Sequence, residues 1–274
     1  MKSYLLFLTV VVLVVGYPAA LAVADWYPGD GHKMHFPQLP DEDGWDVNAS
    51  WVPGIQAKQL ADDWRCSQTG DITDIHWWGS HEYGHPVPPF SFIIEIYSDD
   101  PVGPGGSDPD NEFSKPDAML WDRYVPYSEL SVVQIDQPTP QQGWYDPNTG
   151  VWRHPDHSTY YQYNLTDIVN PCPQYEDTIY WLAITAQVMS ESYLWGWKTA
   201  DVDQYPAPYT GEHYMDDAVW RDFAPPTPWA ELYDPRFPPP DQVSLDLAFV
   251  ITPEPASLSL LALGGLVVLL RRRR

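Results

Sequence analysis

Proline is the residue that most constrains the fold of this chain. The 274 residues include 30 prolines and 17 glycines. Proline removes a backbone donor and glycine weakens a helix interior, so the segments between them are too short for long helices. Between residues 25 and 252 no helical periodicity is sustained. The spacing therefore predicts an all-β fold with many loops.

Alternating apolar and polar residues predict where the strands lie. Residues 90–97 and 244–251 alternate with the period of two that is typical of a strand with one buried face. Residues 178–188 are apolar on both faces, which predicts a central strand. Together these segments predict a single antiparallel, jelly-roll-like β-sandwich over residues 59–251. Further candidate strands are 59–65, 72–78, 120–125, 130–136, 160–165, 194–199 and 217–220.

Three stretches are expected to be irregular. Residues 25–58 form a polar lead-in rich in proline and glycine, and residues 99–116 form an acidic loop. Residues 224–240 carry seven prolines, which predicts an extended, polyproline-like coil.

The N-terminus has the composition of a secretory signal peptide. Lys2 precedes an apolar stretch of 12 residues, 4–15, and small residues follow with two A-x-A cleavage patterns. This stretch is too short for a spanning helix. We therefore expect signal peptidase to remove residues 1–24, with Asp25 or Val23 as the mature start.

The C-terminus is a second apolar segment, bounded by proline and arginine. Residues 256–270 form a run that would span about 22 Å as a helix, whereas a hydrocarbon core is about 30 Å thick. The terminal arginines would hold that end on the cytoplasmic side. Two interpretations remain open: a short transmembrane helix held transiently for sorting, or a permanent anchor.

The order of parts in this tail resembles a known sorting signal. Pro253, Glu254 and Pro255 precede the apolar run, and Arg271, Arg272, Arg273 and Arg274 end the chain. This arrangement is similar to the PEP-CTERM signal of Gram-negative bacteria and covers residues 252–274. The resemblance implies recognition by an exosortase-type enzyme, cleavage near the Pro-Glu-Pro motif, and delivery to the envelope or exopolysaccharide.

The body has its own resemblance. Residues 60–66 and 72–80, together with Gly196–Thr199, Asp216–Trp220 and Leu245–Phe249, are similar to a pattern in uncharacterised secreted planctomycete proteins. The resemblance implies an exported β-sandwich and no established activity.

Charge excludes some partners. Without Lys2 and the four terminal arginines, 14 − 5 = 9 basic residues remain, and without Glu254, 38 − 1 = 37 acidic ones, so residues 25–252 carry a net charge near −28. Such a surface repels nucleic acid and is compatible with cations or neutral polysaccharide. The 14 Trp and 18 Tyr argue against disorder.

Two cysteines, Cys66 and Cys172, lie in a chain that is expected to be exported, where disulfides persist. A bridge between them would stabilise the fold by about 4–5 kcal/mol in the chain-entropy model. Two buried free thiols are the alternative.

One motif points to zinc chemistry. His81, Glu82 and His85 fit H-E-x-x-H, in which two histidines one helical turn apart bind zinc and the glutamate acts as a base. Gly84 and the following Pro86 make a stable helix improbable here. We therefore expect a loop and no catalytic residues.

Acidic and aromatic residues suggest ligands. Asp108, Asp110 and Glu112 place several oxygens in one loop, as calcium requires. Aromatic pairs at 77–78, 144–145, 160–161, 195 and 197, and 229 and 233 could form a sugar-stacking face or fill the core.

We expect an exported envelope or exopolysaccharide-associated structural or interaction protein that is not an enzyme. A carbohydrate-binding module is the first alternative, and a zinc-dependent or glycoside hydrolase the second.

Overall fold

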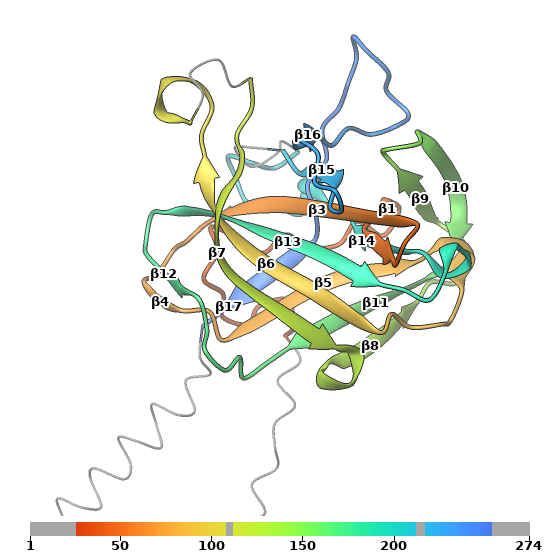
Figure 1. Cartoon of the computed structure of the whole chain (residues 1–274), viewed down its shortest axis with the longest axis horizontal. Helices are drawn as coiled ribbons and strands as arrows, with labels where there is room; N and C mark the ends of the chain where they lie inside the picture. Colours follow the sequence, from red (N-terminus) through yellow and green to blue (C-terminus); the bar gives the residue numbers. More distant parts are fainter. Residues whose placement is uncertain (1–25, 108–111, 212–216, 254–274) are drawn as a thin grey trace, which may run out of the picture.

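The computed structural model describes residues 26–107, 112–211 and 217–253, which form two facing β-sheets (Figure 1). The first sheet has the order β10 (Val151–His157), β9 (Gln142–Asp146), β1 (Trp45–Asn48), β14 (Trp195–Lys198), β5 (Asp74–His81), β11 (Thr159–Leu165) and β8 (Ser131–Asp136), with β17 (Phe249–Thr252) also paired to β5. The second has the order β16 (Ala230–Glu231), β15 (Val219–Asp222), β3 (Gln56–Arg65), β2 (Ser50–Val52), β13 (Ile179–Gln187), β6 (Ser91–Asp100) and β7 (Lys115–Pro126).

The remaining elements are short. β4 (Gly70–Asp71) and β12 (Pro173–Gln174) form a small separate ladder. The helical turns in the described ranges are all of the 3₁₀ type: η1 (Glu82–Gly84), η2 (Gly103–Gly105), η3 (Tyr127–Glu129), η4 (Glu191–Tyr193) and η5 (Val202–Gln204). The all-β prediction is confirmed. Within the same ranges no helix is long and apolar enough to cross a membrane.

The two sheets pack through large aromatic side chains. Phe92 of β6 contacts Trp77 of β5, Tyr163 of β11 and Trp195 of β14, with ring centroids 5.2, 5.1 and 5.1 Å apart. Aromatic pairs of this kind contribute beyond the area they bury. The sequence distributes these rings at alternate strand positions, and the sandwich core follows from that pattern.

Two details of the predicted fold need correction. The expected lead-in 25–58 is not separate from the sandwich, because it supplies β1 and β2 and the start of β3. Trp45 and Val47 of β1 are buried, so this proline-rich segment still carries core residues. The sheets are also not wholly antiparallel, since β1 pairs with β9 and β2 with β13 in parallel.

The close approach of β5 and β14 explains why residue 79 is a glycine. Gly79 of β5 lies under the Trp195 ring and beside the carbonyl of Gly196 in β14, and a side chain at Gly79 would overlap both. β5 and β14 can pair at this position because Gly79 carries no Cβ.

β17 fixes the end of the domain. It pairs with β5 in the register Ile251↔Ile75 and Thr252↔Asp74. On its other edge, the amides of Lys33 and Gln38 donate to the carbonyls of Ile251 and Phe249, at 2.8 and 3.3 Å. The last strand is therefore held on both sides up to the point where the C-terminal tail begins.

Candidate functional site

The site begins at Thr252, where the folded domain meets the sorting signal predicted from the sequence. The Thr252 hydroxyl donates to Asp74 Oδ2 at 3.2 Å, and the Thr73 hydroxyl donates to the Thr252 carbonyl at 3.5 Å. Thr252 is 5% exposed. The tail therefore leaves the domain from a buried, hydrogen-bonded position.

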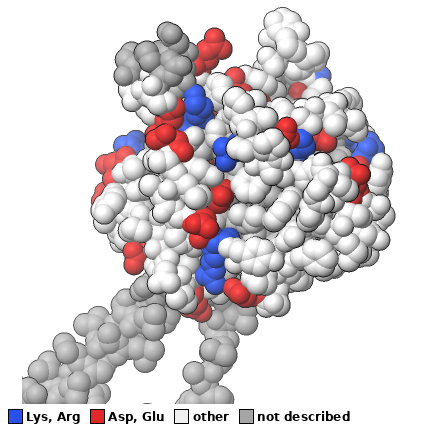
Figure 2. Space-filling view, viewed as in Figure 1, with Lys and Arg blue, Asp and Glu red and all other residues white. Residues whose placement is uncertain are grey.

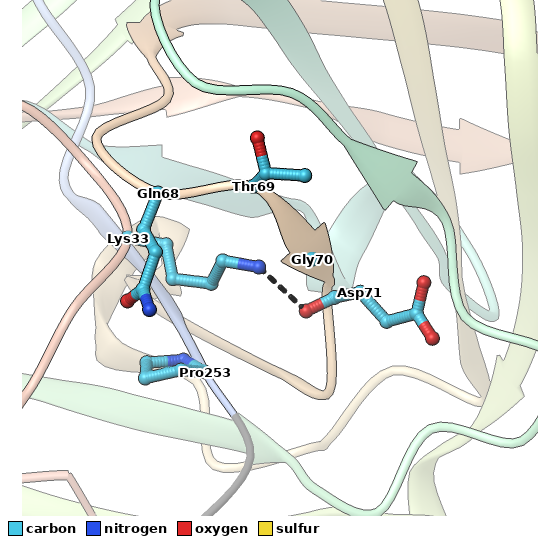
Figure 3. A pocket seen from close by; sticks show the side chains of 6 residues that line it. All are labelled: Lys33, Gln68, Thr69, Gly70, Asp71 and Pro253. Carbon is cyan, nitrogen blue, oxygen red and sulfur yellow. Dashed lines mark hydrogen bonds between the residues drawn. The ribbon is translucent and has the colours of Figure 1, made fainter.

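A pocket of about 300 Å³ lies beside this exit (Figure 3). Pro253, the first residue of the Pro-Glu-Pro motif, forms one wall, and the turn around β4 forms the other. The pocket is lined by Lys33, Gln68, Thr69, Gly70, Asp71 and Pro253. The sequence brings these residues together because β17, the segment before β1 and the β3–β5 connection meet at this edge.

Lys33 supplies the positive charge of this pocket. Its side chain is 2% exposed, and Nζ donates to the backbone carbonyl of Asp71 at 2.9 Å. The Asp71 carboxylate points away from this ammonium in Figure 3. Gly70 has a φ of +145°, and a Cβ there would lie 3.0 Å from Lys33 Nζ. Glycine at this position therefore leaves room for the ammonium to pass beneath β4.

The rest of the predicted sorting signal lies outside the described residues. This holds for Glu254, Pro255, the apolar run 256–270 and Arg271 to Arg274, and equally for the signal peptide 1–24.

The H-E-x-x-H residues lie at a strand end and in a 3₁₀ turn, without the helix that this zinc motif requires. His81 ends β5 and Glu82 begins the η1 turn, where Tyr83 has a φ of +59°, so no helix aligns the two histidines. The His81 ring packs against Tyr161 and the His85 ring against Tyr193, with centroids 6.1 and 5.8 Å apart. Burial lowers the pKa of His81 to about 4. The motif therefore spans the end of β5 and a 3₁₀ turn, and its lack of a catalytic role stays a prediction.

Glu82 instead joins an ion-pair network that the sequence did not predict. Arg153 of β10 pairs with both Glu82 and Asp156, the second at 3.1 Å. The His157 ring lies between two carboxylates, with Nδ1 2.9 Å from Asp156 and Nε2 3.0 Å from Asp46. This network fastens η1 and β10 to β1 at one end of the first sheet.

The pKa values in this network follow from burial and hydrogen bonds. Burial lowers the pKa of His157, but the hydrogen bonds to Asp156 and Asp46 outweigh it, so the pKa lies above its ordinary value. Burial alone would raise the pKa of Asp156. The hydrogen bonds from His157 and the Tyr83 amide outweigh this effect and hold the pKa of Asp156 below its ordinary range. Lys198 Nζ lies 3.5 Å from Asp46 and is also buried. Buried charges of this kind persist because each has a partner.

Comparison with known families identifies the body of the chain. Residues 34–252 match a domain of unknown function, DUF7901. The chain belongs to the DUF7901 family. Residues 252–274 match the PEP-CTERM protein-sorting motif, so the predicted sorting signal is confirmed. No curated protein matches the chain. The planctomycete origin stays a prediction.

The predicted calcium residues lie mostly outside the part of the DUF7901 chain that the structure describes, so calcium binding there stays a prediction. Asp108 and Asp110 lie outside the described residues, and Glu112 is exposed. Among residues 26–107, 112–211 and 217–253, no group of three or more His, Cys, Asp or Glu side chains is arranged to hold a metal.

The predicted bridge between Cys66 and Cys172 is not formed in the structure, which places both as free, buried cysteines. Cys66 Sγ donates to the Gln68 carbonyl at 3.1 Å and Cys172 Sγ to the Pro173 carbonyl at 3.6 Å, so each sulfur is directed to its own turn. Burial raises the pKa of the Cys172 thiol to about 11 and also raises that of Cys66.

Most aromatic residues of the predicted sugar-stacking face fill the core of the DUF7901 domain. Trp77, Trp144, Trp195 and Trp197 are each at most 1% exposed. Trp229 is half-buried, and the Arg221 guanidinium lies over its ring at 4.1 Å. This contact belongs to a polar cluster on the outer face of the second sheet: Arg221 donates to Gln59 at 2.8 Å and to the Tyr97 hydroxyl at 3.2 Å.

Proposed function

We propose that this protein is an exported, non-catalytic structural or interaction component of the cell envelope or exopolysaccharide of a Gram-negative bacterium. An exosortase-type enzyme recognises its C-terminal tail and removes it near the Pro-Glu-Pro motif. One observation carries the proposal: the last strand of the domain ends at Thr252, the residue at which the sorting motif begins. The folded domain and the C-terminal sorting signal are thus joined without an intervening linker.

This junction suits a protein that is delivered by its tail. β5 and the residues around Lys33 hold β17 on both sides, so traction on the tail is resisted by backbone hydrogen bonds. The apolar run 256–270 would hold the chain in the membrane before cleavage, and the terminal arginines would mark the cytoplasmic side.

A non-catalytic role is supported by the ion pairs that hold the side chains best suited to acid–base chemistry. Glu82 is paired with Arg153, and His157 with two carboxylates, so neither is poised as a general base toward an open cleft. The excess of acidic residues suits a hydrated surface. On the face seen in Figure 2, acidic and basic side chains occur in small groups among other residues and do not form one patch.

A carbohydrate-binding module is the weaker proposal, because the rings that would stack on sugars are mostly in the core. The polar cluster around Arg221 and Trp229 is the surface that best supports it, since planar rings beside hydrogen-bonding groups suit saccharides. A hydrolase has less support, because Glu82 is paired with Arg153 and the His157 ring lies between two carboxylates.

Replacing Pro253, Glu254 and Pro255 together by alanine tests the proposal. The tail keeps its apolar run and arginines, so we expect the variant to be exported to the membrane but to remain uncleaved and absent from the outer surface. The measurement is the amount of protein in membrane and surface fractions of the producing bacterium.

A double variant in an exposed loop, Pro238→Ala with Asp241→Ala, removes a proline and an acid elsewhere and is the matched control. It should reach the surface like the wild type. Normal surface delivery of the triple variant would contradict sorting through this motif.

A further inference from the structure

A lysine and an aspartate are buried in contact with each other in the first sheet. Lys198 of β14 stands directly opposite Asp46 of β1, and Lys198 Nζ donates to Asp46 Oδ2 at 3.5 Å. Both residues are fully buried. Trp144 of β9 stands on the other side of Asp46 in the register, and the Tyr160 ring lies 5.6 Å from Lys198 Nζ. The pair therefore lies among aromatic side chains, away from bulk water.

The Asp46 carboxylate is only partly satisfied. An ionised carboxylate can accept hydrogen bonds at both oxygens. Within residues 26–107, 112–211 and 217–253, no group donates a hydrogen bond to Asp46 Oδ1, although this atom is buried. The attraction between two buried charges offsets the cost of burying them only when their remaining polar atoms are hydrogen-bonded too. A neutral product with one oxygen in place of two would relieve this cost.

His157 can supply the proton transfers that such a product requires. Its Nε2 lies 3.0 Å from Asp46 Oδ2, the same oxygen that Lys198 Nζ contacts. Its Nδ1 lies 2.9 Å from Asp156, which orients the ring. An imidazole both gives and takes a proton near neutral pH. β1, β10 and β14 thus hold a carboxyl group, an acid–base group and an amine in contact.

We propose that Lys198 and Asp46 condense to an intramolecular amide that joins β14 to β1. One proton first passes from the ammonium to Asp46 Oδ2, which leaves a neutral amine beside a neutral acid. The amine nitrogen then attacks Asp46 Cγ and forms the Nζ–Cγ bond. His157 gives its Nε2 proton to Oδ2 and takes a second proton from Nζ, so the Cγ–Oδ2 bond breaks and Oδ2 departs as water. No further reactant is consumed, and His157 returns to its initial protonation state.

The reaction occurs once in each chain and acts on no external substrate, so it is compatible with a structural role, and it does not depend on the sorting tail. The paired strands hold the reacting groups in place, and such positioning replaces the activation that amide formation otherwise needs. The bond joins residues 152 positions apart in the sequence. Until it forms, Asp46 remains the carboxylate partner of His157, and only in that unreacted state does the imidazole lie between two carboxylates.

Peptide mapping of the full-length protein, denatured and digested with trypsin, tests the bond. Trypsin does not cleave after an acylated lysine, so residues 154–221 should remain one peptide. We expect this peptide to be joined to residues 34–58, with a mass lower than the sum of the two by one water molecule. Tandem mass spectrometry should place the branch at Lys198 and Asp46. Cleavage after Lys198, with residues 34–58 as a separate peptide of full mass, would overturn the proposal.

Lys58 and Asp222 are a matched control within the same digest. They also stand directly opposite each other in neighbouring strands and form an ion pair, but the Asp222 side chain is 34% exposed. Trypsin should therefore cleave after Lys58 as usual. A branch at Lys58 would contradict the need for a buried pair with its own acid–base group.

The part played by His157 is tested with two histidine variants. His157→Ala should slow formation of the bond by about a hundredfold, as expected when a positioned acid–base group is lost. His154→Ala, at an exposed histidine of the same strand, should leave the yield of branched peptide unchanged. Near-ultraviolet circular dichroism checks that both variants fold, and the wild-type digest decides the proposal even if His157→Ala does not. A folded His157→Ala protein with the branched peptide at the wild-type yield would refute the catalytic role of His157.

Discussion

Trp77→Ala should destabilise the domain by about 3–5 kcal/mol, the range seen when a fully buried tryptophan is truncated. Trp77 is fully buried, stacks on Tyr163 with centroids 5.5 Å apart, and meets the edge of Phe92 across the two sheets. Its removal would leave a cavity at the centre of the sandwich that neighbouring rigid rings cannot fill. The measurement is the free energy of unfolding from urea denaturation.

Trp152→Ala is the matched control. Trp152 lies in β10, is 45% exposed and touches Trp45 at its edge, with centroids 5.8 Å apart. The Trp152→Ala substitution should lower the free energy of unfolding by less than about 1 kcal/mol. If the two variants lose similar amounts, the inter-sheet aromatic core is not the main source of stability.

His157→Ala should cost about 3 kcal/mol near pH 6, because it leaves the buried carboxylates of Asp46 and Asp156 without their shared partner. Asp46 would keep only Lys198, at 3.5 Å. The effect should depend on pH, which separates the charged network from simple packing.

The direction of that pH dependence follows from the raised pKa of His157 in the folded protein. An imidazolium with a raised folded pKa contributes its full stability below the unfolded value of about 6.5, and this stability is lost as the pH rises through the folded value. The difference between wild type and His157→Ala should therefore shrink from about pH 6 to about pH 9.

Urea unfolding at both pH values measures this difference. His154→Ala, an exposed histidine three residues away in β10, should show little cost and no such trend. A His157→Ala penalty that grows with pH would contradict a charged imidazole between the two carboxylates.

The sequence predicted the strands that have strong apolar periodicity. The bounds of β6, β11, β13 and β8 lie within three residues of the expected ranges, since burial on one or both faces gives a clear pattern. β1, β2, β9 and β10 were not predicted. They are short or interrupted by glycine, proline and charged residues, and their burial depends on partners far along the chain.

The candidate site also contains some features that are local in the sequence and others that depend on distant strands. The Pro-Glu-Pro motif, the apolar run and the arginines are local features, so the sequence alone predicted the sorting signal. The Lys33 pocket and the His157 network join residues from distant strands, and no spacing in the sequence brings them together. The H-E-x-x-H motif shows the converse: a local pattern whose chemistry requires a helix that Gly84 and Pro86 do not allow.

The central claim is that the chain is delivered to the envelope and that its C-terminal tail is cleaved off near Pro253. Mass spectrometric mapping of the C-terminal peptides of surface-located protein from the producing bacterium tests it most directly. We predict a C-terminus at or near the Pro-Glu-Pro motif, with peptides from Leu266 to Arg274 missing. Intact tail peptides in the mature surface fraction would contradict the account.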